Sequence, residues 1–204
     1  MKLSAILLAG GEGRRMGHVN KAHLTLHGER FIDRQLAVVA DVVDERIVVV
    51  NDASKADEFS SLPPDVRVVL DCYPGEGPLA GIQAGLEAAE APFAWVIGCD
   101  QPLIDAEAAK LLLTRLEEGD YDAALPIIGG RPQPLHAVYR AEVGLIAARL
   151  LAAGNRKLMS LLEELTWIGV EEIEFEAHGI ARTFSDDVDT PEQYDTLVRM
   201  KEQP

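Results

Sequence analysis

The feature that most limits the possible folds of this chain is a regular alternation of short apolar runs with helical patterns. Four apolar runs lie in the first half of the chain, at 3–9, 46–51, 66–71 and 93–100. Continuous apolar runs of this length are typical of strands that are buried on both faces of a parallel sheet. Between and after these runs, apolar residues recur at helical spacing. The helical stripes are Leu36, Val39, Ala40 and Val43; Leu79, Ile82, Leu86 and Ala89; and Ala108, Leu111, Leu112 and Leu116.

This alternation predicts an α/β fold, an open doubly wound and mostly parallel sheet with helices on both faces. The second half is less regular, with strands expected at 123–128, 134–140 and 167–175 and helices at 143–153 and 157–165. A terminal helix is expected at 190–201, where Thr190 is an N-cap and Pro191 takes the first helical position. Because no linker, repeat or charge block interrupts the pattern, we expect a single domain spanning 1–204.

The charge of the chain excludes some classes of partner. Its net charge is −15, which argues against binding to nucleic acid or to an anionic membrane surface. The segment 1–27 differs, with four basic residues against one acidic residue. No apolar run is long enough for a transmembrane helix. The start resembles no signal peptide, and the two cysteines form no disulfide framework, so we expect a reduced, cytoplasmic protein.

A glycine-rich segment, LAGGEGRRMG at 8–17, follows the first expected strand. It lacks the Gly-Lys-Ser/Thr ending of a Walker A loop, and its last glycine, Gly17, lies one place too late for a dinucleotide-binding fingerprint. Glycines with free N–H groups nevertheless form anion-binding nests. Arg14, Arg15 and Lys21 would add charge-assisted hydrogen bonds to a triphosphate. The segment therefore predicts a nucleoside triphosphate site.

Polar residues end the other three apolar runs, namely Asn51, Asp71 and Asp100. Ligands of open α/β sheets bind beyond the carboxyl ends of the strands, so these residues are expected along one crevice. Asp100, on a rigid strand end, is suited to hold Mg²⁺ through a carboxylate oxygen. The alternative is that these residues simply end strands, as Asn and Asp often do. His136, within the expected strand 134–140, either faces a second substrate or is an ordinary strand histidine.

Several motifs in the expected order resemble those of molybdenum cofactor guanylyltransferases of the MobA type, over about residues 5 to 195. They are LAGG at 8–11, RRMG at 14–17, Lys21, GPLAG at 77–81, CDQP at 99–102, RPQPL at 131–135 running into AVY at 137–139, and DVDTPE at 187–192. The resemblance implies transfer of GMP from GTP to the terminal phosphate of molybdenum-bound molybdopterin, with release of pyrophosphate. It also implies transient contacts with other cofactor-biosynthesis or recipient proteins.

By position, the resemblance implies a set of nucleotide-binding residues. They are Leu8, Ala9, Gly10, Gly11, Arg14, Lys21, Asn51, Asp71 and Asp100. Lys21 would contact the phosphates, Asn51 and Asp71 the guanine and ribose side, and Asp100 the Mg²⁺. Lys21, Asp100 and Arg15 are the expected catalytic residues, because charge on the triphosphate must be neutralised. The nucleotide part would span about 1–105 and the acceptor part about 106–204.

Two departures keep alternatives open. Guanylyltransferases usually have Asn-x-Asn-Thr-Pro late in the chain, whereas this chain has Asp187-Val188-Asp189-Thr190-Pro191. That version, and Asp-Gln-Pro after Cys99, resemble molybdopterin cytidylyltransferases, which use CTP. Those enzymes generally have Leu-Ala-Ala-Gly at the start, whereas this chain has Leu-Ala-Gly-Gly at 8–11, so the first motif favours guanine. A sugar-phosphate nucleotidyltransferase should lack the 131–139 likeness, and a nucleotide-binding regulator without catalysis is a further alternative.

Overall fold

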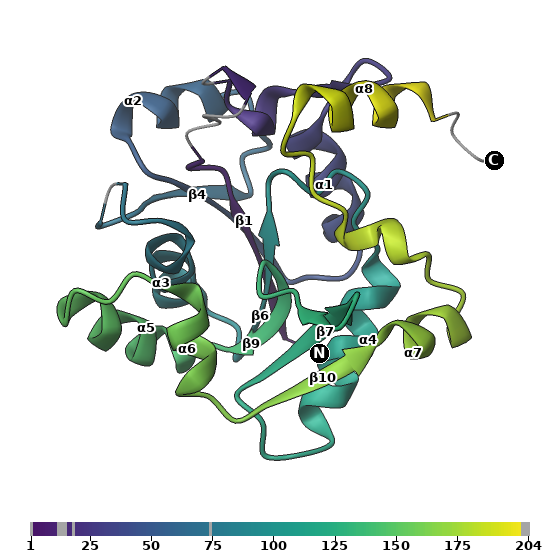
Figure 1. The fold of residues 1–204 in the computed structure, drawn as a ribbon. Coiled ribbons are helices and arrows are strands. Elements are labelled where there is room, and N and C mark those ends of the chain that lie inside the picture. Colours follow the sequence, from purple (N-terminus) through teal and green to yellow (C-terminus); the bar gives the residue numbers. More distant parts are fainter. Residues whose placement is uncertain (1, 12–15, 18, 74, 201–204) are drawn as a thin grey trace.

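A computed structural model describes residues 2–11, 16–17, 19–73 and 75–200. Among these residues, eight strands form one sheet with helices on both of its faces (Figure 1). The sheet strands are β1 (Leu3–Leu8), β4 (Glu45–Val50), β5 (Val66–Leu70), β6 (Phe93–Gly98), β7 (Ala123–Ile128), β8 (Arg131–Pro132), β9 (His136–Arg140) and β10 (Trp167–Glu171). The helices are α1 (Phe31–Ala40), α2 (Ala53–Ala56), α3 (Pro78–Ala88), α4 (Ala106–Glu117), α5 (Val143–Ala152), α6 (Leu158–Glu163), α7 (Glu172–Ala177) and α8 (Pro191–Arg199).

The sheet has the strand order β10-β7-β9-β6-β1-β4-β5, and β8 pairs with β7. Strand β1 is parallel to both of its neighbours, β4 and β6, and β5 is parallel to β4. Strand β9 is antiparallel to β6 and β7, and β10 is parallel to β7. The predicted fold class, a doubly wound and mostly parallel sheet, is confirmed.

The chain reverses direction across the sheet at β1. From β1 it passes through α1 to β4 and β5 on one side, and through α3 it returns to β6 on the other side. Such a reversal opens a crevice at the carboxyl ends of the strands. In β1, Leu8 pairs with Val49 of β4 and with Gly98 of β6, so the loops that follow these three strands leave the sheet side by side.

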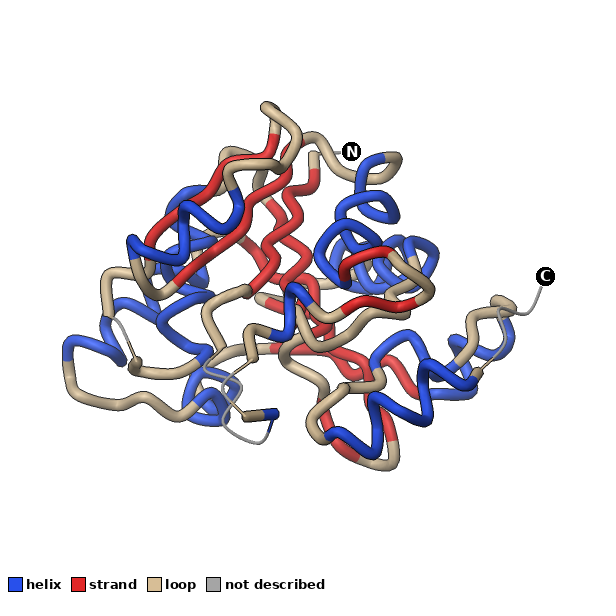
Figure 2. The backbone as a smooth tube through the Cα atoms, turned by 90° about the horizontal axis from the view of Figure 1, so that it is seen from above, coloured by secondary structure: helices blue, strands red, loops and turns tan. Residues whose placement is uncertain are grey.

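Two apolar cores fill the space between the sheet and its helices. One core includes Leu7 of β1 with Leu36 of α1, Leu112 of α4 and Phe175 of α7. The other core joins the opposite face to residues of α3, α5 and α6, and Figure 2 shows the sheet between the two groups of helices. The alternate residues of β1 serve the two cores because successive side chains of a strand point to opposite faces.

The C-terminal segment crosses back to the N-terminal part of the molecule. A third apolar cluster joins Leu197 of α8 to Phe31 of α1 and Leu26 of β2 (Thr25–Leu26), a strand that forms a hairpin with β3 (Glu29–Arg30). The predicted cap of α8 is confirmed. Thr190 accepts a hydrogen bond from the Gln193 backbone N–H in a capping box, and Pro191 occupies the first turn. This capped start fixes residues 187–189 beside the end of β6.

Four expectations about elements need correction. The strand expected at 167–175 ends at Glu171, and helix α7 follows. Its partner strand β7 ends at Ile128, one residue beyond the last pair of Glu171 with Ile127, so the pairing could not continue to residue 175. The strand expected from 134 begins at His136, because a turn closes there with the His136 N–H donating to the Gln133 carbonyl.

The other two corrections concern a helix end and an edge strand. Helix α1 ends at Ala40, so Val43 lies outside it. Strand β5 is not buried on both faces, because it lies at the edge of the sheet, and Leu70 is 47% exposed. Within the described residues, no helix combines the length and the apolar character that crossing a bilayer requires.

Candidate functional site

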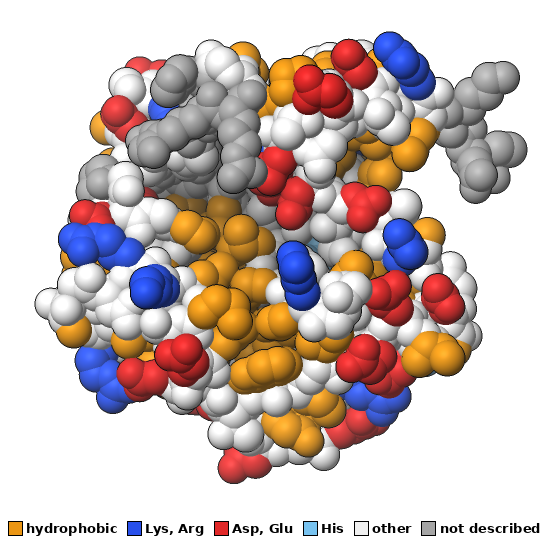
Figure 3. Space-filling view, in the orientation of Figure 1, with side chains coloured by type: hydrophobic (Ala, Val, Ile, Leu, Met, Phe, Trp, Pro, Cys, Tyr) orange, Lys and Arg blue, Asp and Glu red, His pale blue; other side chains and the backbone are white. Residues whose placement is uncertain are grey.

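A cavity of about 440 Å³ opens at the carboxyl ends of β1, β4, β5 and β6. Figure 3 shows a hollow at the centre of one face of the molecule, in which hydrophobic side chains gather. The cavity is lined by Leu8, Gly10, Gly11, Lys21, Val49, Val50, Asn51, Asp71, Gly75, Gly77, Pro78, Gly81, Gly98, Cys99, Asp100, Leu135 and Asp189. The lining combines apolar side chains with a small number of polar groups, as in small-molecule sites.

The loop after β1 passes very close to the loop after β4. A Cβ atom at Gly10 would lie 3.0 Å from the Cβ of Asn51 and 3.1 Å from its backbone nitrogen. Only glycine therefore fits between these loops without displacing one of them. Asn51 is also held from its other side, because its Oδ1 accepts a hydrogen bond of 3.0 Å from Lys55 Nζ.

Helix α3 begins at the same cavity. Gly77 precedes it with a φ of +86°, a conformation that favours glycine, and Pro78 occupies the first turn. Gly81, one turn later, also lines the cavity, and a Cβ there would lie 3.1 Å from Leu8 Cδ2. Small residues thus keep this end of α3 close to β1 and leave backbone exposed to the cavity.

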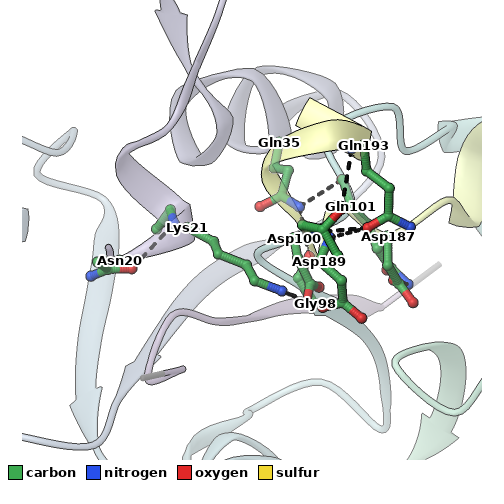
Figure 4. Close-up of polar contacts among 11 residues, drawn as sticks. Asn20, Lys21, Gln35, Gly98, Asp100, Gln101, Asp187, Asp189 and Gln193 are labelled. Atoms are coloured by element: carbon green, nitrogen blue, oxygen red, sulfur yellow. Dashed lines mark hydrogen bonds and ion pairs between the residues drawn. The ribbon is translucent and has the colours of Figure 1, made fainter. Parts of the chain in front are cut away.

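Lys21 lies between two carboxylates at the cavity wall. Its Nζ lies 3.0 Å from Asp100 Oδ2 and 2.5 Å from Asp189 Oδ1 (Figure 4). These two ion pairs connect three parts of the chain that are far apart in the sequence. Burial on its own would lower the pKa of Lys21. The charge of Asp100 and the hydrogen bonds from both carboxylates outweigh burial, so the pKa of Lys21 is raised. This lysine is therefore a permanent cation at neutral pH.

A buried hydrogen-bond network supports the turn that carries Asp100. Gln101, only 2% exposed, donates from Nε2 to Asp187 Oδ1 at 2.9 Å, and its Oε1 lies 3.3 Å from His136 Nδ1. Since Oε1 is an acceptor, His136 must carry its proton on Nδ1. The backbone carbonyl of Asp100 accepts from the Val188 N–H at 2.9 Å. The end of β6 and the segment before α8 are thus tied together at several points.

Burial shifts the pKa of three groups near the site. Desolvation, with the charge of Asp100 as a second cause, raises the pKa of Asp187 to about 6, although the residue as a whole remains exposed. Burial also raises the pKa of Asp71. It raises the pKa of Cys99 to about 12, so this thiol is protonated at neutral pH and unsuited to act as a nucleophile.

The carboxylates of Asp100 and Asp189 fit a magnesium ion that arrives with a nucleotide. Both approach the same point, the ammonium group of Lys21, so they already surround one cation. Mg²⁺ usually takes one or two carboxylates and completes its shell with phosphate and water. Among the described residues there is no cluster of three or more His, Cys, Asp or Glu arranged to hold a metal ion. The side chains of the described residues therefore do not form a complete metal site on their own.

Most of the predicted site residues come together in this one cavity. Its lining includes Leu8, Gly10, Gly11, Lys21, Asn51, Asp71 and Asp100. Ala9 is fully buried, and its N–H donates to the Val49 carbonyl, so it holds the loop in place from beneath. Arg14 and Arg15 lie outside the described residues. His136 is fully buried and is not part of the lining, so the structure favours the interpretation as a strand histidine.

Sequence reasoning did not assign a role to Asp189, which lies against Lys21. The signal was present in the sequence, because Asp189 directly precedes the N-cap Thr190 of a well-marked helix. What the sequence alone does not contain is the return of that helix to the hairpin at 25–30, which places Asp189 at the cavity. Leu135 was also missed as a lining residue, since it lies in a turn rather than at a strand end.

Comparison with known proteins agrees with this geometry. Residues 5–168 match the family model of the MobA-like NTP transferase domain. The chain is 34% identical, over 98% of both sequences, to a protein of Bacillus cytotoxicus named probable molybdenum cofactor guanylyltransferase. Its fold is similar, with a TM-score of 0.83, to molybdopterin-guanine dinucleotide biosynthesis protein A from Archaeoglobus fulgidus, which is 25% identical over 95% of this chain and 96% of that one.

A more distant structure shows how widely the fold is used. The 2-C-methyl-D-erythritol 4-phosphate cytidylyltransferase of Thermus thermophilus is similar with a TM-score of 0.70, covering 97% of this chain and 98% of that one, at 17% identity. This likeness concerns the fold alone. The family model and the full-length relative carry the assignment, and on that basis the chain belongs to the family of MobA-like NTP transferases.

Proposed function

We propose that this protein transfers GMP from GTP to the terminal phosphate of molybdenum-bound molybdopterin and releases pyrophosphate. The observation that carries the proposal is the cavity in which Gly10, Lys21 and Asp100 meet at the ends of three neighbouring strands. Full-length relatives named probable molybdenum cofactor guanylyltransferase, at 31% and 34% identity, support the choice of substrates.

The nucleophile in this reaction is a phosphate oxygen of the acceptor. A phosphate monoester has a second pKa near 6, so it is largely dianionic at neutral pH and requires no strong general base. Catalysis then depends on orientation and on neutralising the charge that develops at the α-phosphate and the pyrophosphate. The raised pKa of Lys21 supports this role, because the side chain stays charged at every physiological pH.

We assign the metal to Asp100, with Asp189 beside it. When bound, Mg²⁺ would supply positive charge to the triphosphate. Asp100 and Asp189 would hold it, and the ammonium group of Lys21, now 3.0 and 2.5 Å from their oxygens, would turn to the phosphates. Arg14 and Arg15, which lie outside the described residues, are proposed as further phosphate contacts, and Arg15 as a catalytic one.

We propose that the base and ribose lie on the side of the cavity formed by Leu8, Gly10, Gly11, Asn51 and Asp71. Both loops there are constrained, one by the close approach at Gly10 and the other by the bond from Lys55 to Asn51. A rigid wall of this kind is suited to distinguish one base from another. Ala9 would support this wall from beneath rather than contact the nucleotide.

CTP is the alternative donor, and residues 187–189 are the feature that favours it. In the sequence these residues resemble the cytidylyltransferase version of the motif, whereas LAGG at 8–11, with Gly10 at its third position, resembles the guanylyltransferase version. Asp189 lies beside Lys21 and Asp100, at the end of the cavity to which we assign the metal. A residue at that end is badly placed to read the base, so we give Gly10 the greater weight and propose GTP.

The remaining expectations become part of the proposal. We propose one domain with a nucleotide part at about 1–105 and an acceptor part at about 106–204, joined through the contacts of Asp189 with Lys21. Molybdopterin would be held by the acceptor part and passed to recipient proteins through transient contacts. We propose a cytoplasmic location, because the relatives are named for a step in cofactor biosynthesis.

Thermal-shift titration with GTP, CTP, UTP and ATP in the presence of Mg²⁺ tests the donor. We expect selective stabilisation by GTP, since only a ligand that binds the folded state raises its melting temperature. Selective stabilisation by CTP would overturn the guanine assignment. Absence of an effect with every nucleotide would favour a non-catalytic role.

A further inference from the structure

We propose that Gln35 is a positioning residue for the metal-binding carboxylate of Asp100, a role that rests on the proposed function. Gln35 lies in α1, and it is not among the residues that line the cavity. It acts on Asp100 through the backbone of residues 98–101 (Figure 4).

Gln35 lies on the buried face of α1, where the helical pattern predicts an apolar residue. It is fully buried, and its neighbours on the buried face of α1 include Ile32, Leu36 and Val39. Burying a carboxamide without hydrogen bonds is energetically unfavourable, because its polar atoms lose their contacts with water. A glutamine here is therefore favourable only if its polar atoms find partners within the protein.

The partners of Gln35 are two backbone carbonyls on either side of Asp100. Its Nε2 donates to the carbonyl oxygens of Gly98 and Gln101, both at 2.8 Å. Because both partners are acceptors, the NH₂ group must face the turn, which fixes the orientation of the carboxamide. The same two residues close the turn, since the Gln101 N–H donates to the Gly98 carbonyl at 3.2 Å. One side chain thus clamps both ends of this turn.

The geometry of this turn sets the direction of the Asp100 carboxylate. The side chain of Asp100 folds back so closely over Gly98 that a Cβ there would lie 2.5 Å from Asp100 Oδ1. A rotation of the 98–101 backbone would therefore move that carboxylate away from Lys21. The segment before α8 would move as well, because the Val188 N–H donates to the Asp100 carbonyl.

Stability alone does not account for glutamine at this position. Its Oε1 is buried and has no hydrogen-bond partner among the described residues, so half of the carboxamide remains unsatisfied. An unsatisfied buried acceptor destabilises the folded state, and this cost offsets most of what two hydrogen bonds contribute. Gln35 therefore adds little folding stability relative to an apolar side chain. Its remaining effect is to fix the backbone of the turn at 98–101.

The chain offers a closely matched control in Gln83 of α3. Gln83 is 5% exposed, its Nε2 donates to Glu87 Oε2 at 2.6 Å, and its Oε1 likewise has no hydrogen-bond partner in the described part of the chain. It does not line the cavity, and its hydrogen bond stays within its own helix. Gln35→Leu and Gln83→Leu therefore remove equivalent buried carboxamides, one tied to the Asp100 turn and one not.

The test compares both variants with the wild-type enzyme in Mg²⁺-dependent GMP transfer. For Gln35→Leu we expect about a tenfold rise in the Mg²⁺ concentration for half-maximal activity or an equal fall in kcat, as for other outer-shell changes. The KM for GTP should change less, because the base and ribose side of the cavity is untouched. Gln83→Leu should leave all three values near those of the wild type.

Hydrogen exchange supplies a readout that does not require activity. Gln35→Leu should speed exchange in peptides covering 98–101 and 187–190 and leave the rest of the sheet unchanged. Equal Mg²⁺ dependence and equal exchange in Gln35→Leu and Gln83→Leu would overturn the positioning role. An inactive wild-type enzyme would instead refute the proposed function. In that case, faster exchange in Gln35→Leu alone would still support the clamp.

Discussion

Lys21 is the residue in which the electrostatics of the site converge. We expect Lys21→Met to reduce turnover by about 100-fold or more, because it removes a fixed charge from the reacting phosphates. The variant should also lose about 1 to 2 kcal/mol of stability, since Asp100 and Asp189 would then face each other without a cation. Turnover assays and urea unfolding measure the two effects.

Added Mg²⁺ should restore stability to Lys21→Met more than it stabilises the wild type, because the metal can replace the missing ammonium group. Lys110→Met is the control, since Lys110 forms a surface pair with Glu107 and its side chain is 50% exposed. It should change stability by less than about 0.5 kcal/mol. Equal responses of the two variants to Mg²⁺ would contradict the account of this site.

Because His136 is buried, we expect it to make the stability of the protein depend on pH. Burial lowers the pKa of His136 to about 3, below its ordinary value of 6.5. A lowered histidine pKa means that the unfolded chain binds the proton more readily. The stability that neutral, buried His136 contributes is therefore fully present above about pH 6.5 and is lost as the pH falls towards 3.

The slope from this one histidine is up to about 1.4 kcal/mol per pH unit. His136→Gln, which does not titrate, should lose less stability than the wild type as the pH falls from 6.5 to 4. Urea unfolding at a series of pH values measures the difference. Parallel pH profiles for the two proteins would show that His136 is not the group responsible.

At the scale of elements, the close contact of α3 with β1 provides a strict test of the fold. A Cβ at Gly85 would lie 2.3 Å from Ile6 Cγ2, a branched methyl group that cannot move aside. Glycine to alanine within a helix normally stabilises by about 1 kcal/mol. Here we expect Gly85→Ala to destabilise the protein by about 1 to 3 kcal/mol, because overpacking outweighs helix propensity.

Gly144→Ala in α5 is the comparison, since its nearest neighbour would be Leu86 Cβ at 3.1 Å. A shift of a few tenths of an ångström relieves that contact, so the effect should be much smaller. Chemical unfolding of both variants measures the two changes. A Gly85→Ala protein as stable as the wild type would show that α3 lies farther from β1 than described.

The strands and helices of the first half could be predicted because local patterns decide them. Apolar runs and glycine turns give β1, β4 and β6, and the four strand ends could be expected at one edge. Helix α7 could not be predicted, because its sequence continues the pattern of β10. Only the end of the partner strand β7 at Ile128 stops the pairing. The edge position of β5 is likewise a property of strand order and not of its own sequence.

The site could be predicted where its residues follow strands and not where they depend on tertiary contacts. Asn51, Asp71 and Asp100 directly follow or end apolar runs, and all three line the cavity. Asp189 reaches Lys21 through the packing of α8 on Phe31 and Leu26, which no local pattern reveals. A buried glutamine such as Gln35 is visible only once its two carbonyl partners are in place.

At the scale of the whole molecule, the net charge of −15 works against the binding of phosphates. An acidic protein that binds GTP and a phosphate acceptor must concentrate its cations locally. Lys21 lies at the wall, and the two further basic residues of the glycine segment, Arg14 and Arg15, follow Gly11 in the sequence. Binding of GTP should accordingly weaken as salt is added, since these charges act on phosphates.

The most direct test of the central claim is the identity of the product. The enzyme is given molybdenum-bound molybdopterin, Mg²⁺ and equimolar GTP and CTP, and the dinucleotide is identified by mass spectrometry alongside the pyrophosphate released. We predict the guanine dinucleotide with one pyrophosphate per product, and loss of both in a folded Asp100→Ala protein. The cytosine dinucleotide, or undiminished product from Asp100→Ala, would contradict the account.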